Sequence, residues 1–252
     1  MGSRRALTNC DWTSPVSMIP RYEMSCWRGC GVASIEEARP RSPGGCLVSL
    51  AHVRSTHGVQ ILKPTHPIIR SLNKRGPGPS LHGTRVWQST FMLMEFLEGY
   101  PLGQDRRVME IGCGWGLLGI FCAKRFCVEV MLTDADAEVF PYVTAHARLN
   151  GVSVQTEQAR FDGITDRRLA AHDLLLGGDI CFWPELGTQL RRLIERGLSL
   201  GVKKAILADP GRRSFMRLAT YCQRHLSATL IPRQMANRSK SRGYILIVEN
   251  PP

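Results

Sequence analysis

A glycine-rich segment directly after an apolar run constrains the fold of this chain more than any other feature. The run Arg107–Ile111 is typical of a buried strand, and a helix-like apolar segment begins at Leu117. Between them lie Gly112, Gly114 and Gly116. Glycines at such a turn let the backbone approach a ligand closely, and the first N–H groups of the following helix are free to bind it. The segment therefore predicts a ligand-binding turn between a strand and a helix.

The rest of the sequence alternates between strand-like and helix-like segments. We expect further strands at Val59–Leu62, Val128–Leu132, Val152–Phe161, Leu174–Phe182 and Ala205–Ala208. We expect helices at Trp87–Leu97, Leu117–Lys124, Ala137–Leu149, Leu186–Leu198 and Ser214–His225. The last two apolar runs, Ala228–Ile231 and Tyr244–Val248, are expected to pair as antiparallel strands across a basic loop. This alternation predicts an α/β fold of the Rossmann-like, doubly wound kind, with helices on both faces of a mostly parallel sheet.

The N-terminal part of the chain has a different texture. Residues 1–54 show no sustained strand or helix period and contain several prolines, so we expect an irregular, disordered extension there and one domain at 55–252. A mitochondrial transit peptide is the alternative, because Arg and Ser outnumber acidic residues before residue 22. Cys26 and Cys30 have the spacing of half a metal site, but no second pair follows at zinc-finger spacing, so no metal is expected.

The composition indicates in which compartment the protein is expected, but it does not identify a binding partner. The net charge of +12 suits a nucleic acid or an acidic protein surface, and it is equally explained by solubility. No apolar run approaches the roughly 18 residues that a membrane-spanning helix needs. Reduced cysteines behave as small core residues, and five of the nine lie in or beside apolar segments: Cys113, Cys122, Cys127, Cys181 and Cys222. We therefore expect a reducing compartment, the cytoplasm, with the mitochondrion as the alternative.

Two acidic residues indicate which ligand the glycine turn binds. Glu110 lies two residues before the first glycine, and Asp134 follows Gly114 by twenty residues at the end of the next expected strand. A carboxylate at the second position can accept both hydroxyls of an adenosine ribose. The spacing of Gly114 and Gly119 also fits the dinucleotide fingerprint, so NAD is an alternative. Glu110 favours a ligand that carries a sulfonium and an ammonium, because a carboxylate there opposes a diphosphate.

The segment Glu110–Gly116 together with Asp134 resembles the class I methyltransferases that depend on S-adenosylmethionine (SAM), over about residues 59–252. The resemblance implies a seven-stranded sheet whose last strand is antiparallel, and SAM as the cofactor. It also implies that the loop of Gly112, Cys113, Gly114 and Gly116 holds the methionine part of SAM. Asp134 would then bind the ribose, and Asp162 would lie near the adenine.

A second resemblance concerns the methyl acceptor. Asp179 and Phe182 resemble the acidic-x-x-aromatic motif of the seven-strand protein lysine methyltransferases. The segments Gly83–Ser89 and Ala208–Arg212 are also similar to that family, which includes the lysine methyltransferase of the electron-transfer flavoprotein β-subunit. The resemblance implies that Trp87 and Gly178 lie at the cofactor site and that a protein is the substrate.

We hypothesise that Asp179 holds the acceptor amine by a charge-assisted hydrogen bond and that Phe182 walls the methyl-transfer channel. The structural alternatives are a helix-capping or loop carboxylate for Asp179 and core packing for Phe182.

Other functions stay open from the sequence. An RNA methyltransferase is supported by the positive charge and the basic loop 233–242, although such a loop is more often a solvated hairpin connection. The sequence barely opposes a small-molecule methyltransferase. An NAD-linked oxidoreductase would use the dinucleotide fingerprint, and a non-catalytic partner protein would bind the cofactor without turnover.

Overall fold

A computed structural model of the protein describes residues 50–75, 78–79, 83, 85–100, 102, 107–235 and 242–250. Residues 1–49, and with them Cys26, Cys30 and most of the expected extension, lie outside the described residues. The expected boundary between residues 54 and 55 falls inside a strand, β1 (Val53–Thr56), which a short 3-10 helix at Leu50–His52 precedes. The described part of the chain therefore begins before residue 55.

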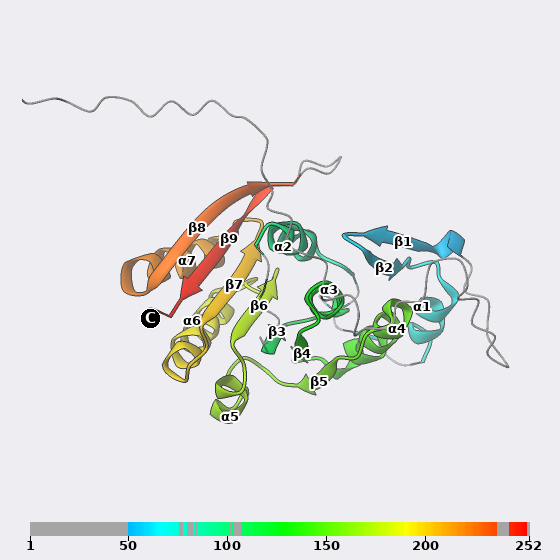
Figure 1. Ribbon diagram of the computed structural model, residues 1–252, viewed down its shortest axis with the longest axis horizontal. Helices are drawn as coiled ribbons and strands as arrows, with labels where there is room; N and C mark the ends of the chain where they lie inside the picture. The colour runs from blue at the N-terminus through cyan, green and yellow to red at the C-terminus, as the bar shows by residue number, and fades with distance from the viewer. Residues whose placement is uncertain are drawn as a thin grey trace, which may run out of the picture. The chain divides into compact units, whose positions relative to one another are not determined.

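The central element is one seven-stranded sheet with the order β5-β4-β3-β6-β7-β9-β8 (Figure 1). Its strands are β3 (Arg107–Ile111), β4 (Glu129–Asp134), β5 (Gln155–Gln158), β6 (Leu174–Gly178), β7 (Lys204–Asp209), β8 (Ser227–Gln234) and β9 (Arg242–Glu249). Neighbours from β5 to β7 pair in parallel, whereas β9 runs antiparallel to both β7 and β8. The predicted doubly wound sheet with an antiparallel last strand is confirmed.

Helices cover both faces of this sheet. One face carries α2 (Gln88–Glu98), α3 (Leu117–Phe126) and α4 (Phe140–Asn150), and the other carries α5 (Asp166–Ala170), α6 (Pro184–Ser199) and α7 (Arg213–His225) (Figure 1). Successive strand residues point to opposite faces, so Val108 packs in the first core and Met109 in the second. Because both faces are buried, the inner strands β3, β4, β6 and β7 are rich in apolar residues, which is why they could be found in the sequence.

A small hairpin packs against the first face. β1 and β2 (Val59–Leu62) pair antiparallel, and α1 (Pro67–Leu72) follows them. Asn150 fixes β2 by accepting the Gln60 N–H at 2.8 Å and donating to the Gln60 carbonyl at 2.8 Å. Burial lowers the pKa of His146 to about 4, so its neutral ring accepts the Leu62 N–H through Nε2 at 3.2 Å. The sequence predicted β2 but neither β1 nor α1.

Several predicted bounds were wrong for local reasons. The strand expected at Leu174–Phe182 ends at Gly178, because Asp179 adopts a left-handed backbone with φ 59° that no strand can continue. The expected strand Val152–Phe161 shrinks to the four edge residues of β5.

Cys127 is not a core residue: it is exposed in the left-handed conformation that ends α3. The five described cysteines are free thiols. Among the described residues, no helix has the length and apolar character needed to cross a membrane.

Candidate active site

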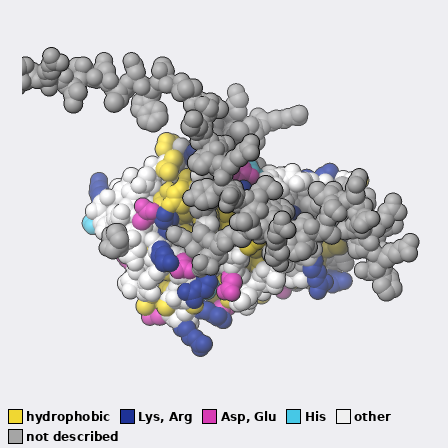
Figure 2. Space-filling view, viewed as in Figure 1, with side chains coloured by type: hydrophobic (Ala, Val, Ile, Leu, Met, Phe, Trp, Pro, Cys, Tyr) yellow, Lys and Arg dark blue, Asp and Glu magenta, His cyan; other side chains and the backbone are white. Residues whose placement is uncertain are grey.

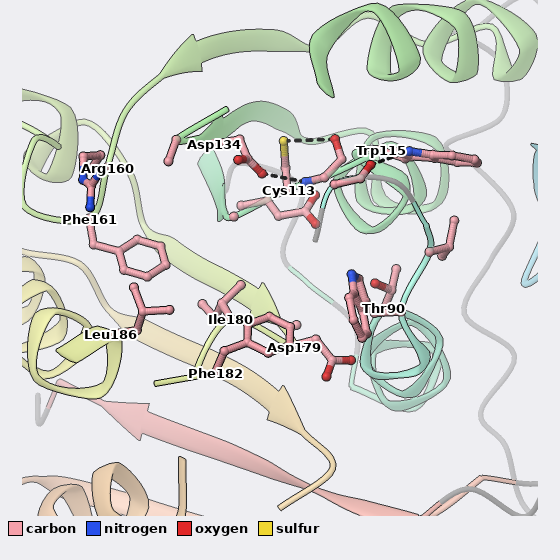
Figure 3. A pocket seen from close by; sticks show the side chains of 18 of the residues that line it. Thr90, Cys113, Trp115, Asp134, Arg160, Phe161, Asp179, Ile180, Phe182 and Leu186 are labelled. Atoms are coloured by element: carbon pink, nitrogen blue, oxygen red, sulfur yellow. Dashed lines mark hydrogen bonds between the residues drawn. The ribbon is translucent and has the colours of Figure 1, made fainter. Parts of the chain in front are cut away.

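A cavity of about 280 Å³ opens at the carboxyl ends of the parallel strands β3, β4 and β6 (Figure 3). Binding sites of open α/β sheets lie at this edge. The cavity brings together all but two of the predicted site residues: Trp87, Glu110, Gly112, Cys113, Gly114, Asp134, Gly178, Asp179 and Phe182. In Figure 3, Asp134 and Cys113 lie across the cavity from Phe161, Phe182 and Asp179. The two carboxylates Glu110 and Asp134 therefore line one cleft, as the sequence required.

The glycine turn forms the floor of the cavity. Gly114 has φ 52°, and a side chain added there would meet no atom within 4 Å, so the backbone faces open space. Gly116, a predicted site residue that does not line the cavity, is the left-handed N-cap of α3, with φ 69°. A Cβ at Gly116 would lie 2.7 Å from Leu132 Cδ1, so the residue must be small for α3 to pack on the sheet. The turn is thus accessible to a ligand at Gly114 and packed at Gly116.

Glu110 is a buried carboxylate with only 4% of its surface exposed. Its Oε2 accepts the Gly119 N–H in the first turn of α3 at 2.8 Å, which satisfies one free donor of that helix. Burial raises the pKa of Glu110 to about 8, although the Gly119 hydrogen bond lowers it, and the nearby Asp134 adds to the rise. A cation beside Glu110 would compensate this burial and stabilise the ionised form.

Asp134 is the last residue of β4, and its carboxylate binds the backbone of both the glycine turn and the segment that follows β4. Its Oδ2 accepts the Gly114 N–H at 2.9 Å and its Oδ1 accepts the Asp136 N–H at 3.0 Å. Burial raises the pKa of Asp134, which these backbone hydrogen bonds partly offset. The carboxylate is therefore held rigidly at the cavity edge, where its remaining lone pairs can accept hydroxyl groups.

The structure does not bring Asp162 to the site. Asp162 is exposed in a turn after β5 and is not among the residues that line the cavity. Its neighbours Ala159, Arg160 and Phe161 line the cavity instead. An Asp-Gly pair is typical of turns, so the sequence signal at this position was that of a loop.

Asp179 lies at the other end of the cavity, and each of its carboxylate oxygens has one hydrogen-bond partner in the protein, which leaves further lone pairs. It is 4% exposed, and its Oδ2 accepts the Ser89 N–H in the first turn of α2 at 3.1 Å. Its Oδ1 pairs with Arg212 Nη1 at 2.6 Å, and the same nitrogen lies 2.7 Å from Asp209 Oδ2. Asp179 thus binds the first turn of α2 and does not cap the helix that begins at Pro184, which was the structural alternative; its role toward an acceptor stays a prediction.

Aromatic rings stand beside Asp179. Phe182 and Trp87 pack edge to face with their ring centroids 5.2 Å apart. A guanidinium lies over each ring: that of Arg212 is 4.2 Å from the Phe182 centroid, and that of Arg85 is 4.1 Å from the Trp87 centroid. Trp183 is 52% exposed at the cavity rim. This end of the cavity has an apolar wall and one buried carboxylate.

Sequence reasoning missed the contacts of Trp115, which lines the cavity, and of Arg212, which pairs with Asp179 beside it. Trp115 stacks on Tyr142 and His146 with centroid distances of 5.4 and 5.2 Å, and its Nε1 donates to the Gly83 carbonyl at 3.0 Å. It thereby connects the glycine turn to the segment that leads to Trp87. Arg212 stood in a motif that was recognised, but nothing in the sequence indicated that it pairs with Asp179.

Comparison with solved structures identifies the fold. The methyltransferase domain of METTL16, without its N-terminal part, superimposes with a TM-score of 0.53 at 13% identity, covering 67% of this chain and 85% of that one. Precorrin-6y C5,15-methyltransferase from Geobacter metallireducens gives 0.51 at 13% identity, over 62% and 85%. The fold is that of the class I SAM-dependent methyltransferases.

Within this class, residues 74–213 match the lysine methyltransferase family, which is more than half of the chain. The chain therefore belongs to the lysine methyltransferase family, and its cofactor is SAM.

Relatives of known activity match at low identity. Protein-lysine N-methyltransferase EFM3 of Chaetomium thermophilum is 27% identical over 166 residues, covering 53% of this chain and 48% of that protein. Ribosomal protein L11 methyltransferase of Thermotoga neapolitana is 28% identical over 139 residues, covering 52% of each. Histidine protein methyltransferase 1 homolog of Rattus norvegicus is 30% identical over 120 residues, covering 44% and 33%. The chain spans about half the length, or less, of these relatives.

The cavity residues fit the chemistry of SAM, which carries a sulfonium, an ammonium and a ribose diol. Glu110 supplies a buried carboxyl group beside the glycine turn, and a bound cation would favour its ionised form by offsetting the raised pKa. Asp134 supplies carboxylate oxygens for the ribose hydroxyls, and Gly114 leaves open space above the turn. Glu110, Asp134 and the turn would therefore hold the cofactor.

Proposed function

We propose that this protein transfers a methyl group from SAM to a nitrogen of another protein, the side-chain amine of a lysine. The observation that carries the proposal is the pairing of a buried carboxylate, Asp179, with an aromatic wall, Phe182 and Trp87, at the cavity end away from Asp134. An extended alkyl amine matches such a site, because the wall packs on its methylenes and the carboxylate accepts its N–H. The family and the lysine-methylating relative EFM3 support this acceptor.

When bound, SAM supplies a methyl group whose bond to sulfur breaks as the acceptor nitrogen's lone pair forms the new bond, leaving neutral S-adenosylhomocysteine. The chain must align the acceptor, and alignment alone can lower a barrier by about 7–11 kcal/mol in favourable cases. In our proposal Asp179 orients the acceptor N–H, while Phe182 and Trp87 exclude water from the nitrogen. A lysine must arrive as the free amine, since its reference pKa of about 10.4 leaves it protonated at neutral pH.

The other acceptors have weaker support. The basic loop 233–242, which an RNA methyltransferase would use, lies mostly outside the described residues, since 236–241 are not described. On the face shown in Figure 2, the described Lys and Arg side chains stand among Asp and Glu side chains instead of forming one basic surface. The NAD-linked alternative loses its basis because the chain belongs to a methyltransferase family. The relatives that act on ribosomal protein L11 or carry a histidine methyltransferase name support a protein as substrate.

The test is methyl transfer from labelled SAM into a cell lysate, followed by separate RNase and protease digestion. We expect label that protease removes and RNase does not, located on lysine by mass spectrometry. Asp179→Asn should reduce the initial rate at least about tenfold while SAM binding persists, since one charged hydrogen-bond partner is lost. Asp166→Asn, at an exposed carboxylate in the first turn of α5, is the matched control and should label like the wild type. Label confined to RNA, or full activity in Asp179→Asn, would overturn the proposal.

A further inference from the structure

We call the end of the cavity with Asp179 and Phe182 the acceptor end. The Arg212 side chain contacts both of these residues. Arg212 precedes α7 and follows β7 through Asp209, Pro210 and Gly211. Its Nη1 lies within hydrogen-bond distance of two carboxylates, Asp179 Oδ1 at 2.6 Å and Asp209 Oδ2 at 2.7 Å. The side chains of these acids are 3% and 1% exposed, whereas that of Arg212 is 25% exposed. One guanidinium thus serves two buried acids.

The same guanidinium packs on the aromatic wall. Its central carbon lies 4.2 Å from the Phe182 ring centroid and 6.0 Å from that of Trp87. A planar guanidinium can donate hydrogen bonds in its plane while its face stacks on a ring, which an ammonium cannot do. Arg212 therefore touches both groups that we assign to the acceptor, the carboxylate of Asp179 and the ring of Phe182.

The backbone around Arg212 is fixed independently of its side chain. Asp209 Oδ1 accepts the Gly211 N–H at 2.9 Å and the Arg212 N–H at 2.7 Å. Gly211 has φ 101°, and a Cβ there would lie 2.8 Å from Tyr244 Cε2. The turn therefore presents Arg212 from a rigid base, and changing its side chain leaves these backbone bonds in place.

We propose that Arg212 is the positioning residue of the acceptor end, which holds Asp179 and Phe182 in place and balances the charge of Asp179. The inference rests on the proposed transfer to an amine and extends it to how that amine is received. Because Arg212 neutralises Asp179, the carboxylate acts as an oriented hydrogen-bond acceptor. It does not act as a counter-ion that would keep the incoming lysine protonated.

The charged groups around Arg212 determine how its removal would change the pKa of the acceptor amine. The described ionisable groups that interact with it are Asp179, Asp209 and Cys181, and burial raises the pKa of the Cys181 thiol to about 12, so it stays neutral. Without Arg212, the buried carboxylate of Asp179 would face the acceptor without its paired cation; Asp209 does not line the cavity, and Arg85 lies over Trp87 at the same end. Opposite charge favours the protonated amine, so its pKa would rise and the reactive free amine would become scarcer at neutral pH.

The experiment compares Arg212→Gln, Arg212→Lys and the control Arg213→Gln, which changes the exposed arginine next in sequence. Each full-length variant is incubated with labelled SAM and unfractionated lysate protein from about pH 6.5 to 10, a range that brackets titration of a lysine amine. We expect Arg212→Gln to lose at least tenfold in initial rate at pH 7 and to recover near pH 10 only to the reduced plateau of Arg212→Lys, because high pH restores the free amine but not the positioning. Arg212→Lys keeps the charge, so its pH profile should match the wild type at a lower plateau. Arg213→Gln should be unchanged, and calorimetry should show SAM binding within about twofold in all variants.

The outcomes separate this inference from the proposed function. A loss in Arg212→Gln that is equal at every pH would overturn the charge-balancing role. If the wild type labels no protein, the proposed function fails, and crystal structures of the wild type and Arg212→Gln still decide the positioning role. We expect the Asp179 carboxylate and the Phe182 ring to move when the guanidinium is removed. Unchanged positions for both would overturn the inference.

Discussion

Replacing Glu110 by Gln should abolish a proton release that accompanies SAM binding. Burial raises the pKa of Glu110 to about 8, so about nine-tenths of the cofactor-free protein carries a proton there at pH 7. A bound cation favours the ionised carboxylate, and the proton must leave as the cofactor enters. Glutamine keeps the size and the hydrogen bond from Gly119 but has no proton to release.

The magnitude follows from the distance between the working pH and this pKa. At pH 7, ionising Glu110 costs about 1.4 kcal/mol, which weakens SAM binding about tenfold relative to pH 9. The affinity should therefore rise with pH up to about 8 and level off above it. The stability of the fold depends on pH with the opposite sign. Because the pKa of Glu110 in the folded protein exceeds its ordinary value of 4.5, the stability that this group contributes is greatest below pH 4.5. It falls as pH rises to about 8, by about 5 kcal/mol in total.

Calorimetry in two buffers with different ionisation enthalpies measures the released protons directly. SAM has an α-amino group that titrates near the reference range of about 7.7–8.0, and this contribution is common to all variants. The difference between wild type and Glu110→Gln therefore isolates Glu110. Glu129→Gln, at an exposed glutamate in β4, should release protons like the wild type. Equal proton release and an equal pH slope in Glu110→Gln would refute the reasoning.

Three further predictions concern the cofactor turn and the rim. Asp134→Asn replaces an oxygen that accepts a backbone N–H, so SAM affinity should fall about 10- to 100-fold in calorimetry, with unchanged binding as the contrary result. Gly116→Ala places a Cβ 2.7 Å from Leu132 Cδ1 at φ 69°, and urea denaturation should show about 1–3 kcal/mol of lost stability. A stability equal to the wild type would contradict the packing described for α3. Trp183→Ala, at a residue 52% exposed, should change stability by less than about 1 kcal/mol but raise KM for the protein acceptor. An unchanged KM would place the acceptor elsewhere.

The parts of the fold that were predicted from the sequence are those that bury both faces. The inner strands β6 and β7 contain apolar runs of three and four residues, and Gly151 ends α4 in the left-handed conformation expected of a helix stop. β1 escaped prediction because its residues VRST are half-exposed in an isolated hairpin, where no apolar period is needed. α1 and α5 have only six and five residues, too few to show a helical period.

The site was predictable where a backbone requirement fixes the residue type. Gly114 and Gly116 need positive φ, and Asp134 must reach back to the turn, so spacing alone located them. The Arg212 contact with Asp179 joins residues 33 positions apart whose meeting depends on how β6 and β7 end. Asp179 itself has a positive φ, which the types of its neighbouring residues did not predict. Such contacts follow from tertiary structure and leave no periodic signal in the sequence.

A crystal structure of the protein with S-adenosylhomocysteine tests the central claim most directly. The account predicts the nucleoside in the cavity at the ends of β3 and β4, its ribose hydroxyls on Asp134 and its amino-acid part above Gly114 on the Glu110 side. Density for the product at any other surface, with Glu110 and Asp134 making no contact to it, would contradict the account.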